Sequence, residues 1–172
     1  MRNVIKCFSK DWTFEDQMDA LNCTIFAHDQ TVNYPSHRGN GISFTKVGIG
    51  SSNRGNVRTL KHHLATNEHE NSTIFYLKVD IEGEELNSLP EWVSSGALNH
   101  VKQMALEFHL GPIHSQRRFN WLLELMSQLY KLNFRLISHE INMTVGKAAN
   151  DNYYSYMEVV FMKDDVWNFL DT

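Results

Sequence analysis

Two carboxylates follow an apolar segment near the centre of the chain. Residues 76–86 read Tyr-Leu-Lys-Val-Asp-Ile-Glu-Gly-Glu-Glu-Leu, so Asp80 and Glu82 come directly after a predicted strand. Alternate side chains of an extended chain face the same side, and ligands of α/β proteins bind where strands end. We therefore predict that Asp80 and Glu82 act as hydrogen-bond acceptors or bases; the alternative is a plain strand exit. Glu84 and Glu85 are expected to be solvated at the start of a helix.

Three further polar residues close other predicted strands. Asp29 follows the segment 24–28, and Glu107 and His109 close the segment 101–108. Glu107 and His109 again face one side, where they could line a substrate pocket, with His109 as a base because imidazole titrates near neutral pH. The alternatives are an aspartate that caps the next turn and polar residues that only end a strand.

The sequence gives little indication of a metal-binding site or of a nucleophilic active site. Glu107, His109 and His114 are close along the chain, but they lack the paired spacing of a tetrahedral zinc site. His62 and His63 are adjacent on a predicted helix and therefore point apart. The sequence contains no Gly-x-Ser-x-Gly motif. We expect no metal.

The segments that must position these residues alternate between strand-like and helix-like patterns. Strands are predicted at 4–8, 24–28, 42–47, 73–79, 101–108, 134–139 and 156–162, and helices at 13–21, 57–65, from 84, and at 115–132. Thr13 and Asp16 resemble a capping box, and Pro90 is expected to interrupt or end its helix. This alternation predicts an α/β sandwich with a mostly parallel sheet, closed by a C-terminal antiparallel strand pair.

Length and composition fit one domain over residues 1–172, whose abrupt start as a strand leaves open whether N-terminal sequence is missing. Hydrophobic residues make up 42% of the chain, and the formal net charge is -4. Because nucleic-acid binding needs a basic stripe, we expect no nucleic-acid partner. No apolar run is long enough to span a bilayer, so we expect no membrane contact by this segment.

Five segments carry a family resemblance through their order in the chain. They are Asp11-Trp12-Thr13-Phe14-Glu15, Cys23-Thr24-Ile25-Phe26-Ala27-His28-Asp29-Gln30-Thr31, Val47-Gly48-Ile49-Gly50, Leu77-Lys78-Val79-Asp80-Ile81-Glu82-Gly83 and Leu106-Glu107-Phe108-His109. In this order they resemble the methyltransferase-like proteins related to the FkbM group, of the methyltransferase-like protein 24 type. The resemblance covers nearly the whole chain. It implies a Rossmann-like fold that uses S-adenosylmethionine (SAM).

The resemblance also implies site residues and an activity. Ser9, Asp11, Asp29, Gly48, Ile49 and Asp80 would border SAM, with Asp29 on the ribose; Asp80, Glu82 and His109 would be catalytic; Glu107 and His109 would contact the acceptor. The implied activity is methylation of a hydroxyl or other polar group of a small molecule or glycan. The compartment stays open between the secretory pathway or extracellular space and the cytoplasm, and the oligomeric state stays open too.

One departure from the family supports an alternative function. The first turn of the family contains a glycine, which lets SAM approach the backbone, whereas residues 6–11 read Lys-Cys-Phe-Ser-Lys-Asp here. The alternative is a non-catalytic domain that keeps the fold and binds a partner or ligand without turnover.

Overall fold

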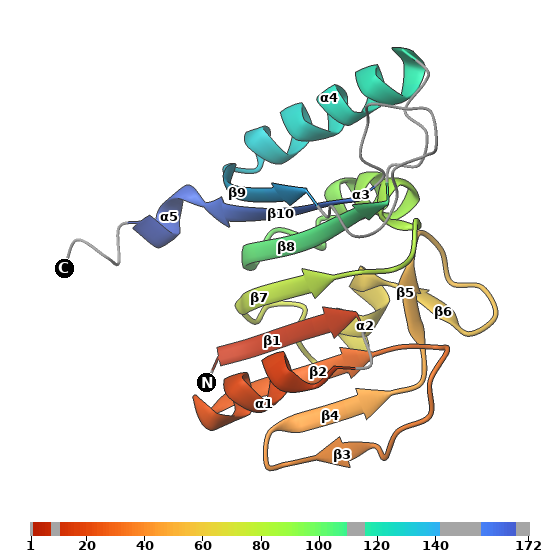
Figure 1. Ribbon diagram of the computed structural model, residues 1–172, viewed down its shortest axis with the longest axis vertical. Helices are drawn as coiled ribbons and strands as arrows, with labels where there is room; N and C mark the ends of the chain where they lie inside the picture. Colours follow the sequence, from red (N-terminus) through yellow and green to blue (C-terminus); the bar gives the residue numbers. More distant parts are fainter. Residues whose placement is uncertain (1, 8–10, 110–115, 142–155, 168–172) are drawn as a thin grey trace.

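An eight-stranded sheet forms the centre of the computed structural model, which describes residues 2–7, 11–109, 116–141 and 156–167. The strands lie in the order β3-β4-β2-β1-β7-β8-β10-β9 (Figure 1). Their bounds are β1 Arg2–Cys7, β2 Cys23–His28, β3 His37–Arg38, β4 Ile42–Thr45, β7 Ile74–Val79, β8 Val101–His109, β9 Phe134–Ile141 and β10 Tyr156–Lys163. The chain thus crosses over to place its first strand in the middle.

The pairing directions confirm the predicted fold class. β4, β2, β1, β7 and β8 pair in parallel with one another, whereas the edge strand β3 is antiparallel to β4. β10 is antiparallel to β9, as predicted, and it is also antiparallel to β8. The carboxyl ends of the five parallel strands therefore meet at one edge, which is where the predicted site residues were expected.

A second, two-stranded sheet was not predicted. It consists of β5 (Gly48–Gly50) and β6 (Val57–Thr59), which pair in parallel. The predicted helix at 57–65 therefore starts with a strand, and α2 spans only Leu60–Thr66. Thr59 explains the boundary, because its backbone is extended and its hydroxyl accepts a hydrogen bond from His62 N at 3.2 Å, which caps the helix.

Two details of the other helices differ from the prediction. α1 (Thr13–Ala20) has Trp12 as its N-cap without a side-chain cap, so Thr13 and Asp16 form no capping box. Asp16 instead pairs with Arg38 at 2.8 Å. α3 (Glu85–Ser94) runs through Pro90. Leu89 and Trp92 are fully buried on either side of this proline, and their packing outweighs the hydrogen bond that proline cannot donate.

Two apolar layers cover the two faces of the sheet. Val4 and Ile5 are adjacent on β1, yet they belong to different buried clusters because alternate strand residues face opposite sides. The larger cluster takes its helical members from α2, α3 and α4 (Gln116–Lys131), and the smaller one packs against α1. A short helix, α5 (Asp164–Trp167), follows β10. Within the described residues, no helix has the length and apolar character needed to span a membrane.

Candidate functional site

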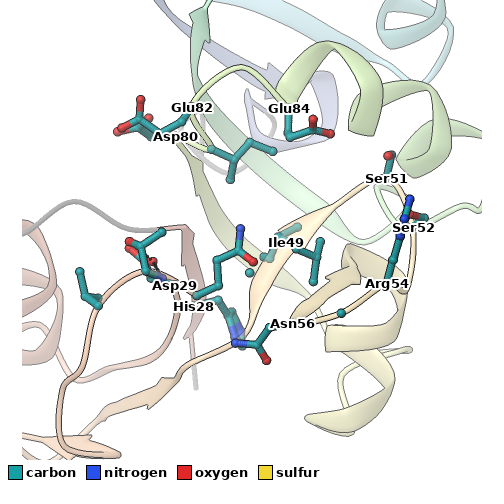
Figure 2. A pocket seen from close by; sticks show the side chains of 17 residues that line it. His28, Asp29, Ile49, Ser51, Ser52, Arg54, Asn56, Asp80, Glu82 and Glu84 are labelled. Carbon is teal, nitrogen blue, oxygen red and sulfur yellow. Dashed lines mark hydrogen bonds between the residues drawn. The ribbon is translucent and has the colours of Figure 1, made fainter.

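A cavity of about 920 Å³ opens at the carboxyl ends of β2 and β7. Its walls come from three segments: the chain after β2, the β5–β6 sheet with its connecting loop, and the turn after β7. Figure 2 shows Asp80 and Glu82 on one wall, Asp29 on another and Ile49 toward the middle. Arg54 lies on the far wall and contributes a positive charge, whereas the carboxylates of the lining are Asp29, Asp80, Glu82 and Glu84.

The predicted site residues divide into three groups. Asp29, Gly48, Ile49, Asp80 and Glu82 line the cavity. Glu107 and His109 lie beside Asp80 rather than in the lining. Asp11 is exposed just before α1, where its Oδ1 accepts hydrogen bonds from Thr13, and Ser9 lies outside the described residues. The roles assigned to these residues remain predictions, but the two sheets together bring five of them to one cavity.

The position of Asp29 is compatible with both roles considered for it, namely capping of the next turn and binding of a ligand in the cavity. Its Oδ1 accepts hydrogen bonds from Thr31 N at 2.5 Å and from Thr31 Oγ1 at 2.7 Å, which is the turn-capping role. The residue also lines the cavity. Both hydrogen bonds use Oδ1, so the turn fixes the carboxylate, and among the described residues Oδ2 has no hydrogen-bond donor and can accept from a bound hydroxyl.

The cavity is lined in part by His28, which packs against His63 and which the sequence analysis missed. His28 is only 2% exposed and its ring centroid lies 4.1 Å from that of His63 on α2. Burial, and secondarily the neighbouring His63, lowers the pKa of His28 to about 3. His63 Nε2 lies 3.1 Å from the carbonyl oxygen of Gly48, which ties α2 to the cavity wall. Gly48 itself lies within strand β5.

Asp80, Glu107 and His109 form a half-buried cluster across two strands. The parallel register that pairs Val79 with Leu106 places Asp80 beside Glu107. One oxygen or nitrogen from each of the three residues lies within 4.8 Å of the others. Burial, followed by repulsion from Glu107, raises the pKa of Asp80 to about 6. The sequence analysis had considered Glu107 and His109 for a metal only with their neighbours along the chain.

Glu85 corrects one expectation of the sequence analysis. It was expected to be solvated like Glu84, but it is fully buried. Its carboxylate accepts hydrogen bonds from Ile81 N at 2.9 Å and Gly83 N at 3.1 Å, and it lies 3.1 Å from His109 Nδ1. Burial of this charge is compensated because backbone donors and an imidazole surround it. The one available signal was the glycine two positions earlier, which allows the turn to fold back onto the side chain.

Solved structures are similar to this chain at low sequence identity. A candidate rRNA-methylase from Clostridium thermocellum is 9% identical, with a TM-score of 0.54 and coverage of 94% of this chain and 86% of that one. Fibrillarin, a pre-rRNA processing protein from Methanococcus jannaschii, is 8% identical, with a TM-score of 0.57 and coverage of 94% and 66%. A candidate tRNA methyltransferase from Streptococcus pneumoniae, solved in complex with S-adenosyl-L-methionine, is 10% identical, with a TM-score of 0.48 and coverage of 93% and 65%.

The fold is therefore that of the Rossmann-like methyltransferases. Residues 13–158 match the sequence model of a family described as a methyltransferase domain, and the chain belongs to that family. No curated protein matches the chain.

The prediction about binding partners is wrong. It excluded nucleic acid and named a small molecule or glycan as the acceptor, whereas proteins of the same fold carry names that refer to rRNA. The physical reason is that a net charge of -4 is a sum over the whole chain, while recognition depends on the local field at a site. Fold alone does not fix the acceptor.

Proposed function

We propose that the cavity binds SAM and that the protein transfers its methyl group to a polar atom of an acceptor. The observation that carries this proposal is the position of Asp29 and Asp80, which follow β2 and β7 and line one cavity. Because β1 lies between these two strands, the two carboxylates flank the crevice where α/β proteins bind nucleotide-like ligands. The ordered motifs also support assignment to the FkbM-related, methyltransferase-like protein 24 type.

Each cavity wall has a role in this proposal. Asp29 accepts hydrogen bonds from the two adjacent ribose hydroxyls. Gly48 and Ile49 border the adenine, where the buried Ile49 offers an apolar surface. Asp80 lies toward the methionine end of SAM and the acceptor. With a volume of about 920 Å³, the cavity can hold a ligand of this size together with part of an acceptor.

The reaction requires little covalent chemistry from the protein. The sulfur–methyl bond of SAM breaks as the methyl group bonds to the acceptor oxygen or nitrogen, and the sulfonium becomes a neutral thioether. The acceptor loses a proton, which we assign to the group formed by Asp80, Glu82 and His109. The protein contributes mainly by holding donor and acceptor in line.

The non-catalytic alternative gains no support from the described residues. It rests on the turn at 6–11, of which residues 8–10 lie outside them. The retained carboxylates at the ends of β2 and β7 favour the enzyme instead.

Calorimetry with SAM tests the site. We expect Asp29→Ala to weaken SAM binding by about 10- to 100-fold, because hydrogen bonds to a charged group contribute about 1.5–3 kcal/mol. Asp165→Ala is the matched control, since Asp165 lies on α5 and its surface pair with Lys102 contributes little. Absence of SAM binding by the folded wild-type protein, or equal affinity in Asp29→Ala, would overturn the proposal.

The acceptor is tested separately with SAM labelled in its methyl group. The protein is incubated with an RNA fraction and with an RNA-free fraction of small molecules and glycans, and the label is followed in each. Label in the RNA fraction identifies a nucleic-acid acceptor, and label in the other fraction identifies a different class. SAM binding without label in any fraction would support the non-catalytic alternative.

A further inference from the structure

The cluster of Asp80, Glu107 and His109 offers the donor set of a metal site. We infer that these three residues bind one divalent cation, such as Mn²⁺ or Mg²⁺, at the edge of the cavity. This inference replaces the sequence-based expectation of no metal. Cation binding stands on its own geometry, whereas the role that we give the cation in catalysis rests on the proposed methyl transfer.

The three donor atoms are placed by the sheet rather than by a flexible loop. Asp80 follows β7 directly, and Glu107 and His109 belong to the paired strand β8. Their donor atoms lie within 4.8 Å of one another. Ligands at about 2.1 Å on opposite sides of one ion are about 4.2 Å apart, so small side-chain rotations bring all three into its coordination shell.

Asp80 provides an independent indication of a missing partner. Its Oδ1 atom is buried, and within the described residues it has no hydrogen-bond donor. His109 Nε2 lies 3.9 Å from this oxygen, which is beyond hydrogen-bond distance. A buried acceptor without a donor is costly, and a cation beside it removes this cost.

Glu85 orients His109 in the way that a carboxylate commonly orients a metal-binding histidine. The fully buried Glu85 carboxylate lies 3.1 Å from His109 Nδ1 and accepts a hydrogen bond when that nitrogen carries the proton. The other nitrogen, Nε2, then presents its lone pair toward Asp80 and lies 3.6 Å from Glu82 Oε2. Histidines that bind metals usually donate their second N–H to a carboxylate in this way.

A cation held by three protein ligands keeps open positions for the acceptor. Two carboxylates and one imidazole suit Mn²⁺ or Mg²⁺, which complete their shells with water or substrate oxygen. An acceptor hydroxyl bound there would become more acidic and would lie beside the methyl donor. Asp80 and His109 then serve as ligands, and Glu82, whose side chain is 89% exposed, is left to pass the proton to solvent.

Titration with Mn²⁺, followed by the electron paramagnetic resonance signal of free Mn²⁺, tests the inference in the absence of SAM. We expect one Mn²⁺ per chain, displaced by excess Mg²⁺. Glu107→Gln should weaken binding by at least about tenfold, the loss that removing even an orienting partner of a ligand causes. Glu124→Gln, on the exposed face of α4, is the matched control and should bind as the wild type does.

A second variant keeps the test decisive if Glu107→Gln disturbs folding, as checked by circular dichroism. Asp80→Asn preserves the shape of the side chain and should weaken Mn²⁺ binding as strongly. No stoichiometric Mn²⁺ binding by the wild type, or wild-type affinity in both variants, would show that His109 only forms ion pairs with these carboxylates. Because SAM binding is measured without Mn²⁺ and Mn²⁺ binding without SAM, failure of either proposal is seen independently.

Discussion

His28 is a buried histidine whose pKa is strongly lowered. It is 2% exposed, and within the described residues neither ring nitrogen has a hydrogen-bond partner. Burial first, and His63 second, lowers its pKa from 6.5 to about 3. His28 is therefore neutral in the folded protein at any pH at which the unfolded chain would begin to protonate it.

This buried imidazole predicts that acid destabilises the protein. Between pH 6.5 and about pH 3, the unfolded chain binds a proton at His28 that the folded protein does not bind. Stability is thus fully present above pH 6.5 and falls as the pH drops; from pH 7 to pH 5 the loss from His28 is about 2 kcal/mol. Urea unfolding at the two pH values measures it, and His28→Phe should remove most of this loss.

The exposed His62 provides the control for that measurement. His62→Gln changes a histidine of the same helix, α2, that is not buried and should leave the pH dependence close to that of the wild type. If His28→Phe and the wild type lose the same free energy between pH 7 and pH 5, the buried imidazole is not its source. His63, whose pKa burial also lowers, would then be the next residue to replace.

Single residues could be predicted where a local pattern carried the information. Asp29 and Asp80 line the cavity because each directly follows an apolar strand, and that pattern is visible in the sequence. Glu85 could not be predicted in the same way, because Gly83 permits the turn to fold back but does not show that Glu85, and not the exposed Glu84, becomes buried. Its burial depends on how the turn after β7 folds back toward His109, which is a tertiary effect.

At the scale of elements, the turn between β7 and α3 places backbone strain beside the candidate site. Glu82 has φ 56 and Gly83 has φ 102. The left-handed region costs a residue other than glycine about 1–2 kcal/mol. Glu85 offsets this cost by accepting hydrogen bonds from Ile81 N and Gly83 N. The turn thus holds Asp80 and Glu82 in place at the cavity wall.

Gly83→Ala should therefore destabilise the protein through its backbone. The nearest atom to an added Cβ is His109 Cβ at 3.9 Å, so there is no clash and the cost comes from φ 102 alone. We expect a loss of about 2–3 kcal/mol in urea unfolding. Gly55→Ala is the matched control, because its φ of 56 lies in the region that alanine can adopt at about 1 kcal/mol. Equal losses in the two variants would contradict this explanation.

The start of α2 shows why element boundaries were predicted less well than elements. The sequence indicated a helix from residue 57, but Val57–Thr59 pairs with β5, and the Thr59 hydroxyl caps the helix. We predict that Thr59→Ala lowers the free energy of unfolding by about 1 kcal/mol, because His62 N loses its acceptor. Thr59→Ser keeps the hydroxyl and should recover most of the loss. A deficit in Thr59→Ser as large as in Thr59→Ala would exclude the cap as the cause.

For the whole molecule, the sheet could be predicted because its information is repeated along the chain. β1 is apolar on both faces, as Val4 and Ile5 show, and this pattern is typical of a strand in a sheet covered by helices on both sides. The small β5–β6 sheet lacked such a signal, since its strands have three residues each. The cluster of Asp80 with Glu107 was also hidden, because it depends on the register between two strands.

The two proposed ligands meet at Asp80, and this arrangement predicts how variants separate them. SAM at about 100 times its dissociation constant should stabilise the protein by about 2.7 kcal/mol, which raises the melting temperature by about 5–10 °C for a chain of this size. At the same SAM concentration, Asp29→Ala should lose about half or more of this shift, because its affinity is about 10- to 100-fold weaker, but it should keep the shift caused by Mn²⁺. Glu107→Gln should do the reverse.

Asp80→Asn is the variant that tests the arrangement as a whole, because Asp80 both lines the cavity and belongs to the cluster with Glu107 and His109. We expect it to lower both shifts, whereas Asp165→Ala should keep both. Differential scanning calorimetry of each variant with SAM alone and with Mn²⁺ alone measures the two shifts separately. If Asp80→Asn retains both shifts, the two ligands do not share the carboxylate after β7. If Asp29→Ala loses the Mn²⁺ shift as well, Mn²⁺ does not bind independently of the SAM site.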